Sequence, residues 1–236
     1  MQQKKPLIII PAYKEAANIE KLVDNITENY PQYDYVIIND GSKDNTREIC
    51  IRRGYCFLDL PINLGIGGAV QTGYKYAQRN NYEIAIQIDG DGQHDVSQLD
   101  KVIEPLLKEE ADIAIGSRFI KKEGFQSSSI RRFGIRFLSG LIKICTGKKV
   151  LDVTSGYRAV NRKFIEIYAE NYPSDYPEPE AIVAAVMHHG RIQEIPVVMQ
   201  ERQGGTSSIH AWKSVYYMIK VSLAIIVGRI SFGIRR

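Results

Sequence analysis

Short apolar runs alternate with longer stretches of helical periodicity along the first half of the chain, and this alternation constrains the fold most. The strand-like runs are Leu7–Ile10, Tyr35–Ile38, Tyr55–Leu60, Ile84–Ile88 and Ile113–Ile115. Helical periodicity fills the intervals, over residues 19–26, 44–53, 67–79 and 97–110. Strands that alternate with helices form a mostly parallel sheet with helices on both faces. The sequence therefore predicts an α/β fold.

Length and composition fit one domain of this kind. The 236 residues are 44% hydrophobic and 25% charged, which favours a single folded core over disorder. The formal net charge of +4 is too small to indicate a nucleic-acid partner, and phosphate-binding side chains would account for it. The three cysteines form no Cys-x-x-Cys pair, and the first apolar run stops at Pro11, too short for a signal peptide. We therefore expect the catalytic region in the cytosol.

The second half of the chain has a less regular pattern. Residues 131–146 and 179–189 have helical periodicity, and Gln193–Gln200 is strand-like, with Pro196 favouring a sheet edge. A loop rich in glycine and serine, Arg202–Ser208, precedes an apolar tail that we expect to be helical. We therefore divide the chain into a catalytic domain, residues 1–208, and a C-terminal apolar helix, residues 209–236.

Polar turns follow three of the predicted strands. These turns are Pro11–Glu15, Asn39–Asp44 and Asp89–Gln93. Ligands of open α/β sheets bind outside the carboxyl ends of the strands, so the three turns should converge on one binding site.

The strongest single motif is Asp89–His94, which has the sequence DGDGQH and follows a predicted buried strand. Two carboxylates two residues apart can face one hard cation such as Mg²⁺ or Mn²⁺. Asp91 and Gln93 are candidate ligands, and Asp89 would bind the nucleotide or support the ion. An ordinary acidic turn explains the motif equally well when it is taken alone. An EF-hand fits less well, because His94 stands at the glycine position of that loop.

A second turn, Asn63–Ala69, is rich in glycine and precedes a predicted helix, where backbone N–H groups can bind phosphate. It departs from the dinucleotide-binding pattern because Val70 stands at the last glycine position. No Lys-Ser/Thr pair of a P-loop follows. A packing role for these glycines is therefore at least as good an interpretation.

Five arginines of the second half could clamp phosphate groups through two N–H donors each. They are Arg118, Arg131, Arg132, Arg158 and Arg202. Any one of them is more often a solvated surface residue. Arg202 is the best candidate because the donor-rich segment Gly204–Ser208 follows it. His188 and His189 lie on a predicted helix without metal-ligand spacing.

Several motifs occur in a fixed order: Pro11–Glu15, Asn39–Ser42, Asn63–Gly65 and Asp89–Asp91. In order and spacing they resemble those of family-two glycosyltransferases. Three more segments are Gly116–Arg118, Thr154–Arg158 and Arg202–Ser207. These are similar to the branch of dolichol-phosphate mannose synthases and polyprenyl-phosphate glycosyltransferases. The resemblance covers roughly residues 6–208. It implies a GT-A type, Rossmann-like sheet, a nucleotide-diphospho-sugar donor, Mg²⁺ or Mn²⁺, and inversion at the sugar carbon.

The resemblance also implies roles for individual residues. The nucleotide-sugar site would comprise Pro11, Tyr13, Glu15, Asp40 and Asp89. The metal site would comprise Asp89, Asp91 and Gln93. The catalytic set would comprise Asp91, Arg118 and Arg202. We add Glu180 to this set as the base that a hydroxyl acceptor would need. Arg131 and Ser207 would bind the acceptor phosphate.

Two positions depart from the family pattern. Asn39 stands where many members have the first of two aspartates, which changes a charge near the base pocket. The base, GDP- or UDP-type, is therefore open. Ser208 stands where synthases often have lysine, which weakens the case for a prenyl-phosphate acceptor. Glu178 and Glu180 place two acids where an acceptor could approach.

We expect transfer of a sugar to a polyprenyl phosphate, which is already anionic and needs no strong general base. A hydroxyl acceptor on a polysaccharide or glycolipid would need one, and Glu180, Glu178 and Asp152 are then candidates, in that order. A non-catalytic nucleotide-sugar-binding subunit is a further alternative, which the intact Asp89/Asp91 pair disfavours. A nucleotidyltransferase is disfavoured because Pro11–Tyr13 lacks a basic, glycine-rich loop.

The tail bears on where such an enzyme would work. Its aliphatic residues would gain about 3 kcal/mol on membrane insertion, while Lys220 would cost about as much, so spanning is near break-even. Aromatic residues and lysines, including Trp212, Lys213 and Lys220, suit the headgroup level. We therefore expect a peripheral position on the inner face of the membrane. A small membrane-protein partner and an ordinary core-packing helix are the alternatives.

Overall fold

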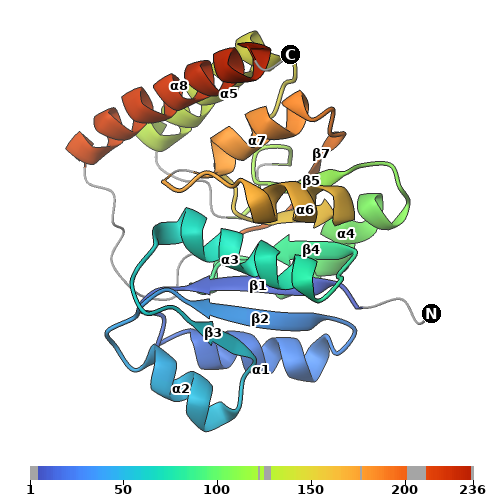
Figure 1. Cartoon of the computed structure of the whole chain (residues 1–236), viewed down its shortest axis with the longest axis vertical. Helices are drawn as coiled ribbons and strands as arrows, with labels where there is room; N and C mark the ends of the chain where they lie inside the picture. The colour runs from blue at the N-terminus through green and yellow to red at the C-terminus, as the bar shows by residue number, and fades with distance from the viewer. Residues whose placement is uncertain (1–4, 122, 125–128, 176, 201–210, 235–236) are drawn as a thin grey trace.

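The computed structural model describes residues 5–121, 123–124, 129–175, 177–200 and 211–234 (Figure 1). Its strands are β1 (Leu7–Ala12), β2 (Asp34–Asn39), β3 (Phe57–Asp59), β4 (Ile84–Gln87), β5 (Ile113–Ser117), β6 (Arg158–Asn161) and β7 (Ile192–Pro196). Its helices are α1 (Ile19–Asn29), α2 (Thr46–Arg53), α3 (Gly65–Arg79), α4 (Leu99–Leu107), α5 (Ser129–Thr146), α6 (Arg162–Glu170), α7 (Pro177–Met187) and α8 (Ala211–Ile234). A short 3₁₀ turn, Val96–Gln98, precedes α4.

The strands form one seven-stranded sheet in the order β3-β2-β1-β4-β6-β5-β7. Only β6 runs antiparallel to its neighbours, β4 and β5; the other pairs are parallel. This arrangement confirms the predicted α/β class and mostly parallel sheet. β7 lies at the edge, as Pro196 suggested, because proline cannot donate a ladder hydrogen bond.

The sheet separates two apolar layers. On one face, Leu7 and Ile9 of β1 pack with residues of α3, α5, α6 and α7. On the other face, Ile8 and Ile10 pack with residues of α1 and α4. This alternation follows from the twofold side-chain period of a strand that is buried on both faces.

The C-terminal helix packs on the first of these layers. Val221 and Ile225 of α8 are fully buried in the cluster that contains β1 and α7. Lys220 forms an ion pair with Asp175. This contact differs from the expectation that the Lys220 ammonium lies among lipid headgroups. None of the helices in the described part of the chain is both long and apolar enough to cross a membrane.

The order of the strands reverses beside β1. The chain builds β1, β2 and β3 outward in one direction and then places β4 on the other side of β1. In doubly wound sheets, a crevice opens at the carboxyl ends of the two strands that flank such a reversal. The segments that follow β1 and β4 therefore lie beside the expected crevice.

Candidate active site

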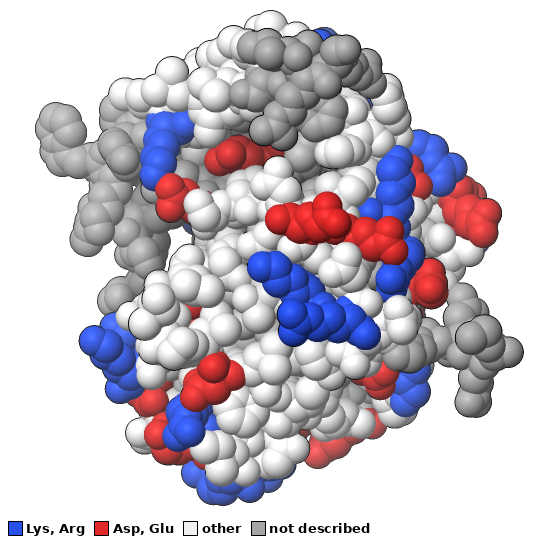
Figure 2. Space-filling view, viewed as in Figure 1, with Lys and Arg blue, Asp and Glu red and all other residues white. Residues whose placement is uncertain are grey.

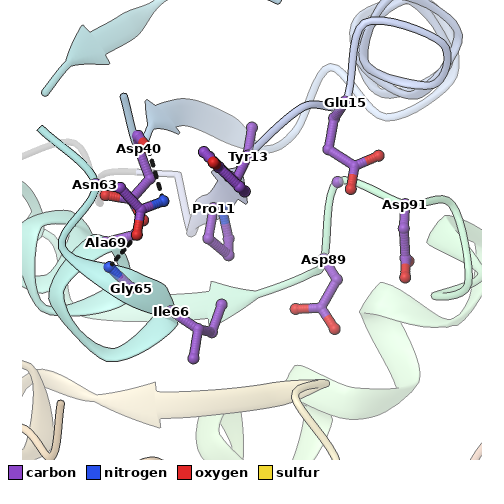
Figure 3. A pocket seen from close by; sticks show the side chains of 12 residues that line it. Pro11, Tyr13, Glu15, Asp40, Asn63, Gly65, Ile66, Ala69, Asp89 and Asp91 are labelled. Atoms are coloured by element: carbon purple, nitrogen blue, oxygen red, sulfur yellow. Dashed lines mark hydrogen bonds between the residues drawn. The ribbon is translucent and has the colours of Figure 1, made fainter. Parts of the chain in front are cut away.

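A cavity of about 440 Å³ lies at this reversal (Figure 3). Its lining comes from the turns after β1, β2 and β4 and from the start of α3. The lining residues are Pro11, Ala12, Tyr13, Glu15, Asp40, Asn63, Gly65, Ile66, Ala69, Asp89, Gly90 and Asp91. The structure therefore brings together the three polar turns and places every residue of the expected nucleotide-sugar set at one cavity.

Asp40 and Asn63 form one side of the cavity. The N–H of Leu64 donates to Oδ1 of Asp40 at 2.7 Å, and Nδ2 of Asn63 donates to the Asp40 carbonyl at 3.0 Å. Burial raises the pKa of Asp40, against the opposing effect of the backbone N–H groups that it accepts. A largely buried acceptor held in this way is suited to the N–H groups of a base or to ribose hydroxyls.

Glycine is required where the Asp40 turn approaches this segment. Gly41 has a φ of +63°, and a Cβ there would lie 2.8 Å from backbone atoms of Ile62 and Asn63. The glycine thus permits both the left-handed turn and the close approach of the two segments.

Tyr13 and Glu15 line the cavity from the turn after β1. The Tyr13 side chain is exposed, whereas Glu15 is buried and accepts a hydrogen bond from Asn18 at 2.9 Å. The Glu15 N–H donates to Thr46 Oγ1 at 3.0 Å. Glu15 therefore stabilises the start of α1 in addition to lining the cavity.

The Asp89–His94 segment forms the opposite side. Figure 3 shows the carboxylates of Asp89 and Asp91 on the same side of the turn that carries them. Asp91 is buried and its Oδ1 accepts the N–H of Gln93 at 3.0 Å. Nε2 of Gln87 donates to Asp89 at 3.3 Å.

His94 holds this turn in place through two contacts. Its Nδ1 accepts the N–H of Asp89 at 2.9 Å, and its ring stacks on Tyr157 with a centroid distance of 4.9 Å. The Tyr157 hydroxyl donates to the Asp95 carbonyl at 3.0 Å. A buried histidine thus links the two ends of the acidic turn through a hydrogen bond.

The donor set of this turn suits Mg²⁺ or Mn²⁺ when a diphosphate supplies further ligands. Within the described part of the chain, no group of three His, Cys, Asp or Glu side chains is placed to hold a metal ion. Mg²⁺ is commonly bound by one or two carboxylates together with substrate phosphates. Asp89 and Asp91, the cavity's two carboxylates from one turn, fit that mode of binding.

The segment Thr154–Arg158 lies behind the acidic turn. A Cβ at Gly156 would lie 3.1 Å from both carboxylate oxygens of Asp89, so glycine allows this contact. The buried Arg158 guanidinium donates to the carbonyls of Val153, Ser155 and Glu178. Arg158, which the sequence left among possible surface arginines, therefore ties α7 to the segment behind Asp89.

Arg118 forms a buried ion pair with Asp152. Its Nε and Nη2 each donate to the Asp152 carboxylate at 2.7 Å, and the side chains are 7% and 0% exposed. These donors are thus committed within the protein, and the phosphate-binding role of Arg118 stays a prediction. Both oxygens of Asp152 accept from Arg118, which argues against Asp152 as a general base.

Glu178 and Glu180 lie in the first turn of α7. Burial raises the pKa of Glu178, against the opposing effect of Arg158; Asp89 raises it further and Arg131 lowers it. Burial likewise raises the pKa of Glu180, with Asp175 adding to the effect and Lys220 opposing it. Glu178 thus lies within the electrostatic reach of the acidic turn and of Arg131.

The remaining predicted residues differ in how far the structure places them. Arg131 is exposed in the first turn of α5. Gln93 lies in the acidic turn, where its carbonyl accepts the N–H of Gln200 at 3.0 Å. Arg202 and Ser207 lie outside the described residues. Their assigned roles stay predictions.

Two open points of the sequence have a structural explanation. Asn39 is buried and donates to Asp59 at 2.7 Å, while Arg47 donates to the other Asp59 oxygen at 2.6 Å. An aspartate at position 39 would face the Asp59 carboxylate. In the glycine-rich turn, Gly67 packs on the backbone of residues 173–174, and its N–H donates to the Ser174 carbonyl. Packing therefore accounts for that glycine.

Sequence reasoning missed two contributors. Asn63 was considered as part of a phosphate turn and of a family motif but not as a partner of Asp40, and His94 served only as an argument against an EF-hand. The position of His94 directly after the acidic motif was the available signal, but its inward orientation depends on Tyr157, which is distant in sequence.

Fold and cavity together define an α/β domain with a cavity at the strand reversal, which an acidic turn lines in part. The chain belongs to glycosyltransferase family 2. The sequence model of this family, described as Glycosyl transferase family 2, matches residues 7–168.

Several relatives are named as dolichyl- or polyprenyl-phosphate glycosyltransferases. The chain is 29% identical to the UDP-N-acetylglucosamine–dolichyl-phosphate N-acetylglucosaminyltransferase of Methanococcus voltae, over 84% of this chain and 86% of the relative. It is 25% identical to the polyprenol monophosphomannose synthase of Mycolicibacterium smegmatis, over 96% of this chain and 89% of the relative. The resemblance to polyprenyl-phosphate glycosyltransferases is thereby confirmed.

A solved structure supports the GT-A-like fold. The glucosyl-3-phosphoglycerate synthase of Mycobacterium tuberculosis, in complex with Mn²⁺, UDP-glucose and phosphoglyceric acid, superposes with a TM-score of 0.73. The match covers 96% of this chain and 79% of that chain at 18% identity. At this identity the likeness concerns the fold alone.

Proposed function

We propose that this glycosyltransferase moves a hexose from a GDP- or UDP-sugar to a polyprenyl phosphate, with inversion at the sugar carbon. The observation that carries the proposal is the shared cavity of Asp40, Asp89 and Asp91 at the strand reversal. The names of the relatives from Methanococcus voltae and Mycolicibacterium smegmatis support the lipid-phosphate acceptor.

Different residues of the cavity would bind different parts of the donor. Asp40, with Pro11, Tyr13 and Glu15, would bind the nucleoside, since Asp40 offers a buried acceptor there. Asp89 and Asp91, with Gln93, would hold Mg²⁺ or Mn²⁺ beside the diphosphate. The bound ion would neutralise the charge that develops on the leaving diphosphate.

The acceptor would enter between the acidic turn and α7. An acceptor phosphate is anionic near neutral pH, so the protein needs to position it more than to deprotonate it. Arg131 would bind it together with Arg202 and Ser207. Arg158 ties the first turn of α7 to the segment that packs on Asp89, which supports a site beside the acidic turn.

A hydroxyl acceptor is the second candidate, and one observation favours it. Burial raises the pKa of Glu180, which makes its carboxylate a stronger base than an exposed glutamate. A transferase to a polysaccharide or glycolipid hydroxyl would use such a group.

The proposed acceptor is a lipid, so the enzyme would work as a peripheral protein on the inner face of the membrane. In this proposal residues 1–208 are the catalytic domain and residues 209–236 attach it to the surface.

Donor binding tests the first half of the proposal. Thermal unfolding of the full chain is measured with UDP-, GDP- and ADP-sugars, each with Mn²⁺ or with EDTA. We expect one nucleotide class to raise the melting temperature only when Mn²⁺ is present, and Asp91→Asn to abolish that increase. Stabilisation that is equal in EDTA, or equal in Asp91→Asn, would rule out a metal-dependent donor site.

A further inference from the structure

The segment that joins β3 to α3, residues 60–64, is held at its two ends by two neighbouring residues of the chain. At its start, the Leu60 N–H donates to the Asn39 carbonyl at 2.9 Å. At its end, the Leu64 N–H donates to Oδ1 of Asp40 at 2.7 Å. The position of this segment therefore depends on the last residue of β2 as well as on Asp40, which lines the cavity.

The Asn39 side chain adds a second bond at the start of the segment. Asn39 and Asp59 are register partners at the carboxyl ends of β2 and β3. Nδ2 of Asn39 donates to Oδ1 of Asp59 at 2.7 Å, and Asn39 is 1% exposed. A hydrogen bond to a carboxylate is stronger than one between neutral groups. This bond therefore fixes Asp59, the residue directly before the segment, relative to β2.

The other end of the Asn39 amide is unsatisfied. Its Oδ1 is buried and accepts no hydrogen bond within the described part of the chain. An unsatisfied buried acceptor destabilises the folded state, and an apolar side chain at this position would avoid that cost. The amide is therefore better explained by the bond that it donates to Asp59 than by a contribution to the core.

Arg47 of α2 binds the second oxygen of Asp59. Its Nε donates to Oδ2 of Asp59 at 2.6 Å, and the two side chains are 52% and 35% exposed. Figure 2 shows acidic and basic side chains interspersed around the part of the molecule that carries α2 in Figure 1, and Arg52 and Arg53 of the same helix also form ion pairs. Exposed pairs of this kind contribute little stability. The buried bond from Asn39 is therefore needed to fix Asp59.

We propose that Asn39 is a positioning residue for the nucleoside part of the donor site. Through Asp59 it holds residues 60–64 against Asp40, so that the Leu64 N–H keeps the Asp40 carboxylate in the orientation that it has at the cavity. This inference rests on the proposed binding of a nucleotide donor at Asp40. It adds a residue that lies outside the cavity lining and acts through its neighbours.

An exchange of the two side chains provides a rescue experiment. In Asn39→Asp, a buried carboxylate would face that of Asp59, and like charges at hydrogen-bond distance repel each other. The two side chains would separate and displace the start of the segment. In Asn39→Asp/Asp59→Asn, the amide at position 59 can donate to the carboxylate at position 39, while its oxygen accepts from Arg47.

Nucleotide binding by the full chain tests this role. UDP and GDP are each titrated by calorimetry in the presence of Mn²⁺, and the one that binds the parent is used for the variants. A hydrogen bond to a charged group can change an equilibrium constant about tenfold, so Asn39→Asp should bind the nucleotide about tenfold more weakly. Asn39→Asp/Asp59→Asn should recover most of this loss. Asn29→Asp, the same substitution on an exposed position of α1, should bind like the parent.

The kinetics separate positioning from a general loss of structure. In Figure 3, Asp40 and Asn63 lie across the cavity from Asp89 and Asp91. In Asn39→Asp, KM for the nucleotide sugar should therefore rise about tenfold. The kcat and the Mn²⁺ concentration for half-maximal activity should stay those of the parent. A fall in kcat at unchanged KM, or no recovery in the double variant, would overturn the proposal.

A second variant and the choice of ligand keep the outcomes distinct. Asn39→Leu removes the donor without adding a charge, so it should also bind the nucleotide about tenfold more weakly and carries the test if Asn39→Asp does not fold. Nucleotide binding that both variants leave unchanged would refute the role of Asn39 alone. Nucleotide binding without sugar transfer to any lipid phosphate would refute the proposed acceptor and leave that role in place. A parent that binds neither nucleotide would refute both.

Discussion

The backbone N–H of Asp89 donates to Nδ1 of His94 across the acidic turn, at 2.9 Å. This bond fixes which imidazole nitrogen carries the hydrogen, because an acceptor Nδ1 must be unprotonated. The bond also holds Asp89 at the position where the segment around Gly156 packs on its carboxylate. We therefore regard His94 as a positioning residue for the proposed metal site.

Replacing His94 by phenylalanine tests this role. His94→Phe keeps an aromatic ring against Tyr157 and removes the acceptor for the Asp89 N–H. Loss of a group that orients metal ligands typically costs about 10–100-fold in metal affinity, so the Mn²⁺ concentration for half-maximal activity should rise by about that factor. Activity at saturating Mn²⁺ should fall much less. Tyr157→Phe, which retains the stacked ring, is the control, and an unchanged Mn²⁺ requirement in His94→Phe would show that the bond does not position the ligands.

The Arg118–Asp152 pair should dominate the stability of the segment behind the site. Removing one partner of a buried ion pair leaves an uncompensated charge and costs about 3–5 kcal/mol. We expect Asp152→Asn to lower the free energy of unfolding in urea by an amount near that range. The exposed Lys108–Glu104 pair provides the comparison, and Lys108→Met should change stability by no more than about 0.5 kcal/mol. Equal effects of the two substitutions would mean that Arg118 is not held mainly by Asp152.

The pH dependence of transfer distinguishes the two acceptor classes. The pKa of Glu180 is raised by burial, so its carboxylate is present above that raised pKa and is lost as the pH falls through it. If Glu180 were the base for a hydroxyl acceptor, kcat/KM would fall on the acidic side above the usual range for glutamate. Glu180→Gln would then lose about 10²-fold or more in rate.

A phosphate acceptor leads to a different outcome. With a phosphate acceptor, Glu180→Gln should retain the rate within a few-fold and keep the acidic limb of the parent, because that limb reports the acceptor. A loss of the limb together with the rate would support the hydroxyl acceptor.

Local sequence patterns predicted most of the first half of the fold. The apolar runs that end at Pro11, Asn39 and Asp89 became β1, β2 and β4, because hydrophobic runs bounded by turn residues leave few alternatives. The expected strand at Tyr55–Leu60 is shorter in the structure, Phe57–Asp59.

β6 and α6 were not predicted. β6 has polar residues, Arg158 and Asn161, at its ends and is a strand because β4 and β5 pair with it on both sides. Such pairing is determined by contacts that are distant in sequence, which single-sequence patterns do not contain. The Arg118–Asp152 pair, 34 residues apart, was missed for the same reason.

Transfer of labelled sugar to lipid tests the central claim most directly. The full chain is incubated with Mn²⁺, undecaprenyl phosphate and the nucleotide sugar that stabilises it, and label extracted into organic solvent is measured. We predict a labelled lipid that carries one sugar per phosphate, requires Mn²⁺ or Mg²⁺, and falls about 10²-fold or more in Asp91→Ala. Hydrolysis of the donor with no labelled lipid, or label that forms equally in EDTA, would contradict the account.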